Sequence, residues 1–239
     1  MKNSIFCAIT LTSWALLACD SDDADPGQPK TEHVYRFEEN MEGWAGDFAD
    51  LPVDGQDIYE LEVGHEQLPE ETGKAEWAIM MKGHNRSDDL FMFLKRKIDG
   101  LKPSTTYNLV FDLEIASQYP EESVGIGGSP GASVYLKAGA TISEPEAVVE
   151  EEGVEDYLRM NIDKGNQAQD GEDMFGIGTI GIEGEEFRYE LISRSNADRP
   201  FPITTDADGS IWLIVGTDSG FEGLTVLYYN QIKVTLIEQ

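Results

Sequence analysis

Short runs of alternating apolar and polar residues follow one another from Thr31 to the end of the 239-residue chain. A period of two is typical of β-strands, and turns rich in glycine, proline and acidic residues separate the runs. The pattern predicts about ten strands, at residues 33–38, 58–63, 76–82, 90–98, 107–116, 132–137, 157–162, 187–192, 211–215 and 225–237. Because no amphipathic helices lie between them, we expect an all-β, antiparallel β-sandwich.

The last two predicted strands, residues 211–215 and 225–237, are the most apolar and flank a turn that contains Gly220 and Gly223. In the first strand both alternating faces are apolar, as in a strand at the centre of a packed sheet. In the second strand one face is apolar and the other carries Lys233. We therefore expect a sandwich that is closed by its C-terminal strand.

One short helix is expected at residues 143–153. Ser143 can cap its N-terminus, Glu146 follows three residues later as in a capping box, and Gly153 can end it. No internal repeat is visible in the sequence and no second linker divides residues 31–239. The pattern therefore predicts one folded domain over that range.

The N-terminal segment has the features of a secretory signal. Lys2 gives it a positive start, and the apolar run at residues 5–17 is shorter than the about 20 residues that a membrane-spanning helix needs. The motif at residues 16–19, Leu-Leu-Ala-Cys, resembles the lipobox of bacterial lipoproteins. The resemblance implies cleavage after residue 18, lipidation of Cys19 and attachment to a lipid bilayer through the acyl chains. The alternative is an ordinary cleaved signal that contains a cysteine.

Residues 20–29 are rich in aspartate and contain no apolar residue larger than alanine. This composition indicates a flexible tether. The expected organisation is a signal peptide at residues 1–18, an acidic tether at residues 19–30 and a β-sandwich domain at residues 31–239. A lipid anchor implies the cell envelope, on either the periplasmic face or the cell surface. Acidic residues after a lipidated cysteine resemble both inner-membrane retention and surface-export signals, so both locations stay open.

The cysteine count indicates how the domain is stabilised, and the charge excludes one class of partner. Cys7 and Cys19 are the two cysteines of the chain. Loss of the signal and lipidation of Cys19 would leave a domain without a disulfide, held by its core. Removal of residues 1–18 would leave 16 basic and 46 acidic residues, a net charge of −30. Such a charge repels nucleic acids and anionic membrane surfaces, so no nucleic-acid partner is expected.

Three segments share a further pattern. Phe37-Glu38 is followed by Gly43-Trp44, a Thr-Tyr pair opens residues 106–113, and an aliphatic alternation runs through residues 228–234. These segments resemble framework positions of jelly-roll carbohydrate-binding modules with a galactose-binding-domain-like fold. The resemblance implies a jelly-roll-like sandwich and non-catalytic glycan binding.

The same resemblance implies a structural Ca²⁺ ion between Glu38 of the first strand and an acidic residue of the last strand. That last position holds Asn230, whose carbonyl oxygen can bind a metal but carries no charge. Because Ca²⁺ takes 6–8 oxygen ligands and accepts neutral ones, Glu38 and Asn230 allow a weakened calcium site.

Predicted loops supply the candidate ligand-binding residues. Phe221 lies near two glycines at a loop tip, where an exposed ring could stack on a sugar. Asp218 and Glu222 beside it could accept hydrogen bonds from sugar hydroxyls. The alternative is that Phe221 folds back and plugs the end of the sandwich. Trp44 and Tyr119 also lie in predicted loops and are further candidates for a stacking platform.

Catalytic chemistry has weaker support. The pair Asp88-Asp89 follows His84 closely, but this cluster is typical of a hydrophilic turn before the strand at residues 90–98. The three histidines of the chain lack the close spacing of a zinc site. The long polar loop at residues 161–173 has many oxygen donors, and long loops between strands are where sandwiches carry function.

The leading interpretation is a lipid-anchored envelope protein whose single domain binds a glycan without catalysing a reaction. The first alternative is a structural or protein-interaction lipoprotein without a sugar ligand, which presents its acidic face to an envelope protein. A third is a polysaccharide hydrolase or lyase, which needs two inward-facing carboxylates within about 5–10 Å of each other.

Overall fold

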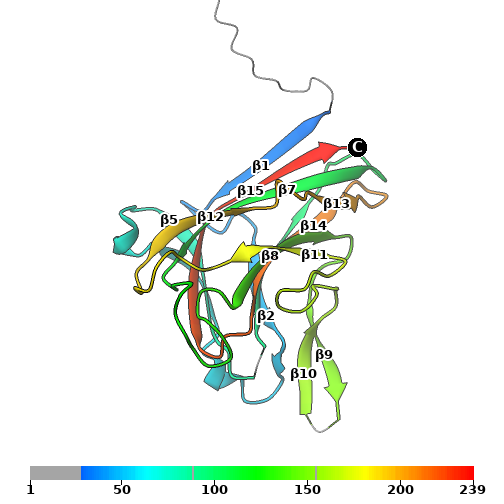
Figure 1. The fold of residues 1–239 in the computed structure, drawn as a ribbon. Helices are drawn as coiled ribbons and strands as arrows, with labels where there is room; N and C mark the ends of the chain where they lie inside the picture. Colours follow the sequence, from blue (N-terminus) through cyan, green and yellow to red (C-terminus); the bar gives the residue numbers. More distant parts are fainter. Residues whose placement is uncertain (1–27, 88, 154) are drawn as a thin grey trace, which may run out of the picture.

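The computed structural model describes residues 28–87, 89–153 and 155–239. In these residues the strands form three antiparallel sheets, and the helical structure consists of the 3-10 helices η1 (Gln56–Tyr59) and η2 (Glu70–Thr72). The expected all-β antiparallel sandwich is confirmed (Figure 1). No helix in the described ranges is long and apolar enough to cross a membrane.

The larger sheet has the strand order β12-β7-β15-β5-β4, with β1 also paired to β15 and β13 to β7. Its strands are β1 (Lys30–Arg36), β4 (Glu62–Gln67), β5 (Trp77–His84), β7 (Thr106–Ser117), β12 (Glu190–Ser195), β13 (Phe201–Thr204) and β15 (Leu224–Glu238). The C-terminal strand β15 lies at the centre of this sheet. Its first part pairs with β5, its second part pairs with β1, and β7 runs along its other side.

The second sheet has the order β11-β8-β14-β6-β2. It consists of β2 (Ala45–Ala49), β6 (Phe91–Ile98), β8 (Val134–Thr141), β11 (Met174–Thr179) and β14 (Ile211–Ser219). A small third sheet has the order β3-β10-β9 and consists of β3 (Leu51–Pro52), β9 (Ala147–Glu152) and β10 (Glu155–Met160). The β9–β10 hairpin projects from the body of the sandwich (Figure 1).

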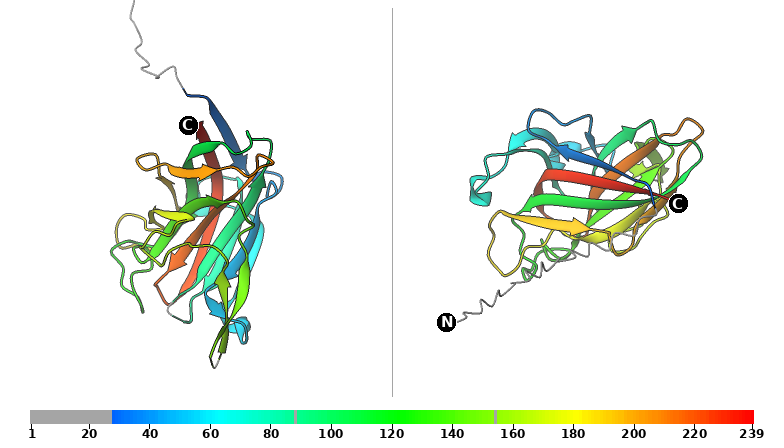
Figure 2. Two further views of the ribbon diagram at one scale, coloured as in Figure 1. Left: turned by 90° about the vertical axis from the view of Figure 1, so that its right-hand side faces the viewer. Right: turned by 90° about the horizontal axis from the view of Figure 1, so that it is seen from above.

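The main core lies between the two large sheets, which face each other in the views of Figure 2. Alternate residues of each strand point into it, such as Leu213 and Val215 of β14 and Val234 and Leu236 of β15. Each such side chain contributes about 1.5–3 kcal/mol when it is removed from water. The alternation in the sequence therefore reports directly on which face of each strand is buried.

The outer face of the five-stranded sheet is covered as well. Phe91, Phe93 and Ile214 form a second apolar cluster on that face, together with Ala49 and Met174. The side chains that pack against this cluster are Ala147 of β9, Met160 of β10 and Ile162 of the following loop. The β9–β10 hairpin and the loop of residues 161–173 thus cover the outer face of the five-stranded sheet.

The helix expected at residues 143–153 is wrong, because the chain forms β9 there. β9 pairs with β10 along its whole length, with Val149 opposite Leu158. The β-branched Val148 and Val149 favour a strand, and the hairpin satisfies backbone groups that a single isolated helical turn would leave to water. The capping pattern at Ser143 was outweighed by this pairing.

Candidate functional site

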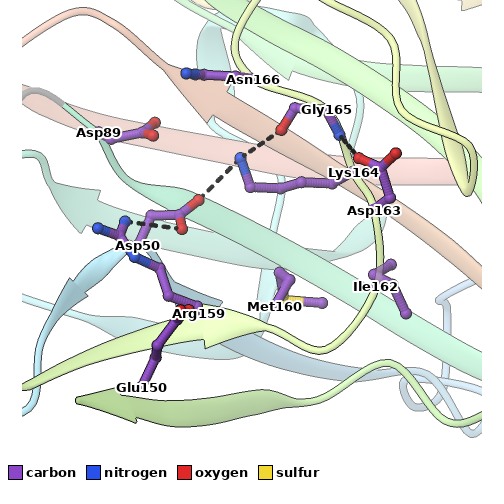
Figure 3. Close-up of a pocket in the computed structure, with 10 residues that line it drawn as sticks. All are labelled: Asp50, Asp89, Glu150, Arg159, Met160, Ile162, Asp163, Lys164, Gly165 and Asn166. Atoms are coloured by element: carbon purple, nitrogen blue, oxygen red, sulfur yellow. Dashed lines mark hydrogen bonds and ion pairs between the residues drawn. The ribbon is translucent and has the colours of Figure 1, made fainter. Parts of the chain in front are cut away.

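A polar cleft of about 420 Å³ lies where the β9–β10 hairpin and the loop of residues 161–173 meet the ends of β2 and β6 (Figure 3). We call it the Lys164 cleft. The residues that line it are Asp50, Asp89, Glu150, Arg159, Met160, Ile162, Asp163, Lys164, Gly165 and Asn166. Four of these side chains are acidic and two are basic, and Met160 and Ile162 are apolar. The lining thus combines hydrogen-bonding groups with a small apolar surface.

Lys164 is the centre of the ion pairs in this cleft. Its Nζ lies 2.7 Å from Oδ2 of Asp218 and 2.9 Å from Oδ2 of Asp50. Arg159 pairs with the other oxygen of Asp50, with 3.2 Å between Nη1 and Oδ1. Burial disfavours the charge of Lys164, but Asp218 and Asp50 outweigh it and raise its pKa. The lysine therefore stays charged and fixes two carboxylates from separate strand ends.

A second buried lysine, Lys137, binds the loop of residues 161–173 from the five-stranded sheet. Lys137 of β8 donates hydrogen bonds to the backbone carbonyls of Lys164, at 2.7 Å, and Gln169, at 2.8 Å. Its Nζ also lies 3.3 Å from Oδ2 of Asp218. Burial lowers the pKa of Lys137 although Asp218 acts in the opposite direction. The loop is thus attached to the sheet by charged groups as well as by apolar contacts.

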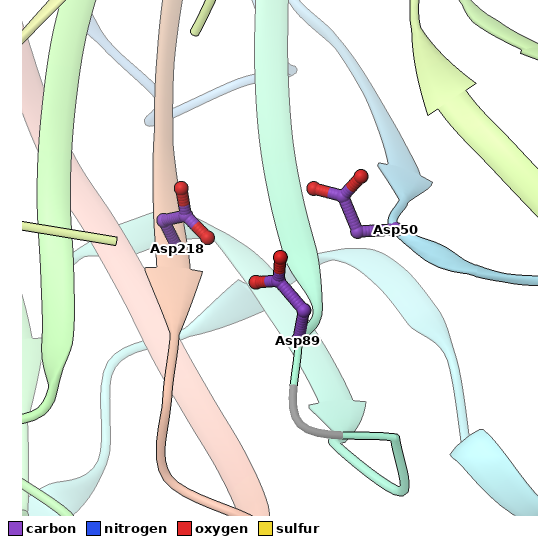
Figure 4. Close-up of side chains that lie close together, drawn as sticks. All are labelled: Asp50, Asp89 and Asp218. Carbon is purple, nitrogen blue, oxygen red and sulfur yellow. The ribbon is translucent and has the colours of Figure 1, made fainter. Parts of the chain in front are cut away.

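Asp218, Asp50 and Asp89 come together beneath the cleft, with carboxylate oxygens within 4.8 Å of one another (Figure 4). Burial, then the neighbouring Asp218, raises the pKa of Asp89 to about 8. Burial acts in the same direction on Asp218, but Lys164, the hydrogen bond with Asp89 and Lys137 together outweigh it and lower the pKa of Asp218. Such a group of acids can bind a cation, and here the ammonium of Lys164 is that cation.

Two of the predicted sugar-stacking residues are buried. Trp44 is 3% exposed and packs edge-on against Tyr35, with 5.5 Å between the ring centroids. Tyr119 is 4% exposed; its hydroxyl donates to the carbonyl of Leu224 and accepts from the N–H of Val226. In this arrangement neither ring offers a face to a ligand.

The remaining predicted ligand-binding residues lie on β14 and the turn after it. Asp218 is fully buried and paired with lysines, so a sugar hydroxyl cannot reach it in this arrangement. Phe221 packs against the main core, and its ring lies so close to Gly125 and Gly223 that a methyl group at either glycine would overlap it. This placement agrees with the plug alternative. A ligand-binding role for Glu222, which is partly exposed, stays a prediction.

Glu38 and Asn230, the predicted calcium ligands, line one polar cavity of about 220 Å³. The side-chain amide of Asn230 donates hydrogen bonds to Glu76, at 2.9 Å, and Glu114, at 2.7 Å. The Nζ of Lys74 lies 2.9 Å from Glu114 and 3.5 Å from Glu76. The carboxylates of Glu76 and Glu114 thus already face an ammonium and amide N–H groups, and a calcium ion between Glu38 and Asn230 would meet the ammonium of Lys74 in the same cavity.

Sequence reasoning missed the residues that build the Lys164 cleft, namely Asp50, Lys137, Lys164 and the paired role of Asp89. One signal was present in the strand that contains Lys137, since a lysine in an apolar strand needs a buried acid as partner. The loop of residues 161–173 was identified as a place for function, and it does line the cleft. Asp88 and Cys19 lie outside the described residues.

No family model matches the chain, and no curated protein matches it. Among solved structures, it is similar to a sugar-binding protein of Bacteroides thetaiotaomicron described as putative, with a TM-score of 0.40, 12% identity and coverage of 82% of this chain and 88% of the other. A mannan-recognising carbohydrate-binding module, TmCBM27, gives a TM-score of 0.38, 13% identity and coverage of 88% and 99%. A family 11 carbohydrate-binding module of Clostridium thermocellum gives a TM-score of 0.36 and 14% identity, with coverage of 87% of this chain and 95% of the other. At these low scores the likeness carries no argument about the ligand.

Proposed function

We propose that the domain binds a neutral glycan in the Lys164 cleft without catalysing a reaction. The observation that carries the proposal is the lining itself: buried ion pairs of Asp50 and Lys164 fix the cleft wall and hold Arg159, and the exposed side chains of Glu150, Asp163 and Asn166 offer donors and acceptors to a ligand. Fixed donors and acceptors can bind the hydroxyls of a sugar at a small cost in side-chain entropy. Met160 and Ile162 supply an apolar patch for the C–H groups of the sugar ring.

The charge distribution favours a neutral ligand over a charged one. At the base of the cleft the buried carboxylates of Asp50 and Asp218 are matched by Lys164, Lys137 and Arg159, and the exposed acids Glu150 and Asp163 of the lining would repel an anion. The chain as a whole carries a formal charge of −29, which repels polyanions such as nucleic acids or acidic polysaccharides. A neutral ligand with many hydroxyl groups is repelled neither by the charges of the cleft nor by the net charge of the chain.

The arrangement of the acids supports binding rather than hydrolysis. A glycosidase needs one protonated and one ionised carboxyl group that both reach the scissile bond. Asp218 is fully buried, and Asp50 is 5% exposed with both oxygens facing cations. Asp89 is then the single member of the three that is open enough to approach a substrate.

Attachment to a membrane is part of the same proposal. We infer that Cys19 carries the lipid and that the residues after it tether the domain in the cell envelope. The first described strand, β1, begins at Lys30, so a tether that ends near residue 30 leads directly into the sandwich. Labelling with a radioactive fatty acid tests this inference, since a Cys19→Ser variant should lose the label.

A protein-interaction role is the second candidate, because apolar residues are exposed at one end of the sandwich. Val124 is 95%, Ile126 71% and Phe187 57% exposed. Contacts join the loops that carry them: Phe187 packs against the Tyr119 ring, and the N–H of Glu222 donates to the carbonyl of Ile126. Glu121 and Glu122 precede Val124, and Glu185 and Glu186 precede Phe187, which suits a partner with an apolar surface and basic side chains at its edge.

A glycan array followed by isothermal titration calorimetry tests the leading proposal. At pH 6.5 the protein should bind a neutral oligosaccharide, and Glu150→Ala or Asn166→Ala should each weaken binding about tenfold, the loss of roughly one hydrogen bond. Phe187→Ala is the matched control, because Phe187 lies outside the cleft and its replacement should leave sugar binding unchanged. No binding to any neutral glycan at millimolar concentration would overturn the proposal. A complex lost only in Phe187→Ala would favour the protein-interaction role.

A further inference from the structure

The three aspartates beneath the Lys164 cleft are not equally neutralised. Asp218 pairs with Lys164 and Lys137, and Asp50 pairs with Lys164 and Arg159. Among the described residues, no basic side chain lies within ion-pair distance of Asp89. Yet Asp89 is held within 4.8 Å of both other carboxylates. Its charge, if present, would therefore be repelled by two neighbours.

Three carboxylate oxygens in this group accept no hydrogen bond in the described part of the chain: Oδ2 of Asp50, which lies in an ion pair with Lys164, and Oδ1 of both Asp89 and Asp218. Oδ1 of Asp89 and Oδ1 of Asp218 are both closed off from solvent. The carboxyl groups of Asp89 and Asp218 point toward each other in Figure 4. Unsatisfied buried oxygens are costly, and a proton placed between the two groups would supply a short charge-assisted bond in place of the repulsion.

Lys164 cannot satisfy a third carboxylate. An ammonium group has three N–H donors, and those of Lys164 face Asp218 at 2.7 Å, Asp50 at 2.9 Å and the carbonyl of Gly165 at 3.3 Å. If Asp89 were ionised, it would compete with these groups for the same ammonium. The contacts that hold the loop of residues 161–173 would then weaken.

We propose that Asp89 and Asp218 share one proton at neutral pH, and that this proton keeps Lys164 in place and the loop of residues 161–173 closed on the sheet. The direction of the Asp89 pKa, raised by burial and then by Asp218, agrees with the geometry. The charged groups that face the pair come from the end of β2, β8, β9, β10 and the loop. They are Asp50, Lys137, Glu150, Arg159 and Lys164.

A consequence for the ligand follows, and this part rests on the proposed function. Asp89 lines the Lys164 cleft, so its proton determines both the local charge and the position of Lys164 that a ligand meets. Binding should therefore be strongest while the proton is present. With a pKa of about 8 for Asp89, affinity at pH 9 should be about tenfold lower than at pH 7, as proton linkage requires.

The shared proton can be measured without any ligand. Infrared spectra of the protein with ¹³C-labelled aspartate should show a neutral carboxyl band at pH 7 that disappears as the pH rises past 8. Asp89→Asn should lack this band, and Asp57→Asn, an exposed aspartate in η1, should retain it. A native protein without the band at pH 7, or a band that persists in Asp89→Asn, would overturn the proposal.

Two further measurements test the role of the proton in loop closure and its effect on glycan affinity. Amide hydrogen exchange in residues 161–173, corrected for its intrinsic pH dependence, should accelerate between pH 7 and 9 in the native protein and not in Asp89→Asn. Unchanged exchange would overturn the role in loop closure. If a glycan binds at pH 7 with an affinity that does not fall by pH 9, the linkage is wrong while the proposed function stands. If no glycan binds, the infrared result still decides whether Asp89 and Asp218 share a proton.

Discussion

The ammonium of Lys164 lies 2.7 Å from Oδ2 of Asp218, although 54 positions separate the two residues in the chain. Lys164 belongs to a loop, whereas Asp218 lies on β14, in the middle of the five-stranded sheet. Both side chains are almost completely removed from solvent. A buried ion pair thus fastens the loop to the sheet at the position where Lys164 lines the cleft.

Replacement of Lys164 by methionine should destabilise the domain by about 3–5 kcal/mol, because Asp218 and Asp50 would be left buried and partly unpaired. Urea unfolding measures the loss. Lys97→Met is the matched control, since Lys97 makes an exposed ion pair with Asp99 and should cost no more than about 1 kcal/mol. A loss in Lys164→Met as small as that of the control would mean that the ion pairs of Lys164 do not hold the loop.

The stability of the domain should fall as the pH rises from 6.5 to 8.5. A carboxyl group whose pKa is raised on folding, as that of Asp89 is to about 8, binds a proton more tightly in the folded state. Its stabilising contribution is complete below the unfolded pKa and is lost as the pH rises through the folded pKa. Thermal unfolding measures the trend.

Asp89→Asn provides the control for this pH dependence. The amide can still donate a hydrogen bond to Asp218 but cannot ionise, so the variant should be more stable than the native protein at pH 8.5 and should lose most of the slope. Lys137, whose lowered pKa acts in the opposite direction, is present in both proteins and cancels in the comparison. Parallel profiles for the two proteins would contradict the assignment to Asp89.

Tyr119→Phe should lower the stability of the domain by about 1–3 kcal/mol without changing sugar binding. The hydroxyl of this buried residue bonds to two backbone groups at the start of β15, so its removal leaves the N–H of Val226 and the carbonyl of Leu224 without their partner. Unfolding and calorimetry measure the two effects separately. Loss of glycan affinity at full stability would restore Tyr119 as a ligand-binding residue.

The sheets could be predicted from the sequence wherever one face of a strand is buried. In β7, buried and partly exposed residues alternate from Tyr107 to Ile115, and this period of two is visible in the amino acids themselves. β9 was missed because its acidic second half and the preceding Ser143 imitate a helix start, whereas its structure depends on pairing with β10. β11 was missed because Gly176 and Gly178 interrupt the apolar pattern, and the register shifts between them.

The site was less predictable because its residues are distant in the chain. Asp50, Asp89, Lys164 and Asp218 lie on separate elements, and only the packing of these elements brings the charges together. In a chain with 46 acidic residues, no single aspartate stands out by its type. A buried lysine is rarer, and Lys137 within an apolar strand was the strongest local signal.

Calcium should leave the melting temperature of the native domain unchanged, and so should a chelator. In the cavity that contains Glu38 and Asn230, the ammonium of Lys74 already lies against Glu114 and Glu76. A divalent ion would have to displace that charge, and Asn230 presents its amide N–H groups to the same carboxylates.

Removal of Lys74 should change this behaviour. In Lys74→Met the carboxylates lose their cation, and Asn230→Asp in the same protein adds a charged oxygen ligand of the kind that Ca²⁺ prefers. The double variant should be less stable than the native domain without metal and should gain melting temperature as calcium is added, by the mass-action relation for a bound ligand. Lys82→Met, which removes a lysine from an ion pair with Glu62, should gain nothing. A native domain that melts earlier with chelator would show instead that Lys74 gives way and that Glu38 and Asn230 bind calcium as the resemblance implies.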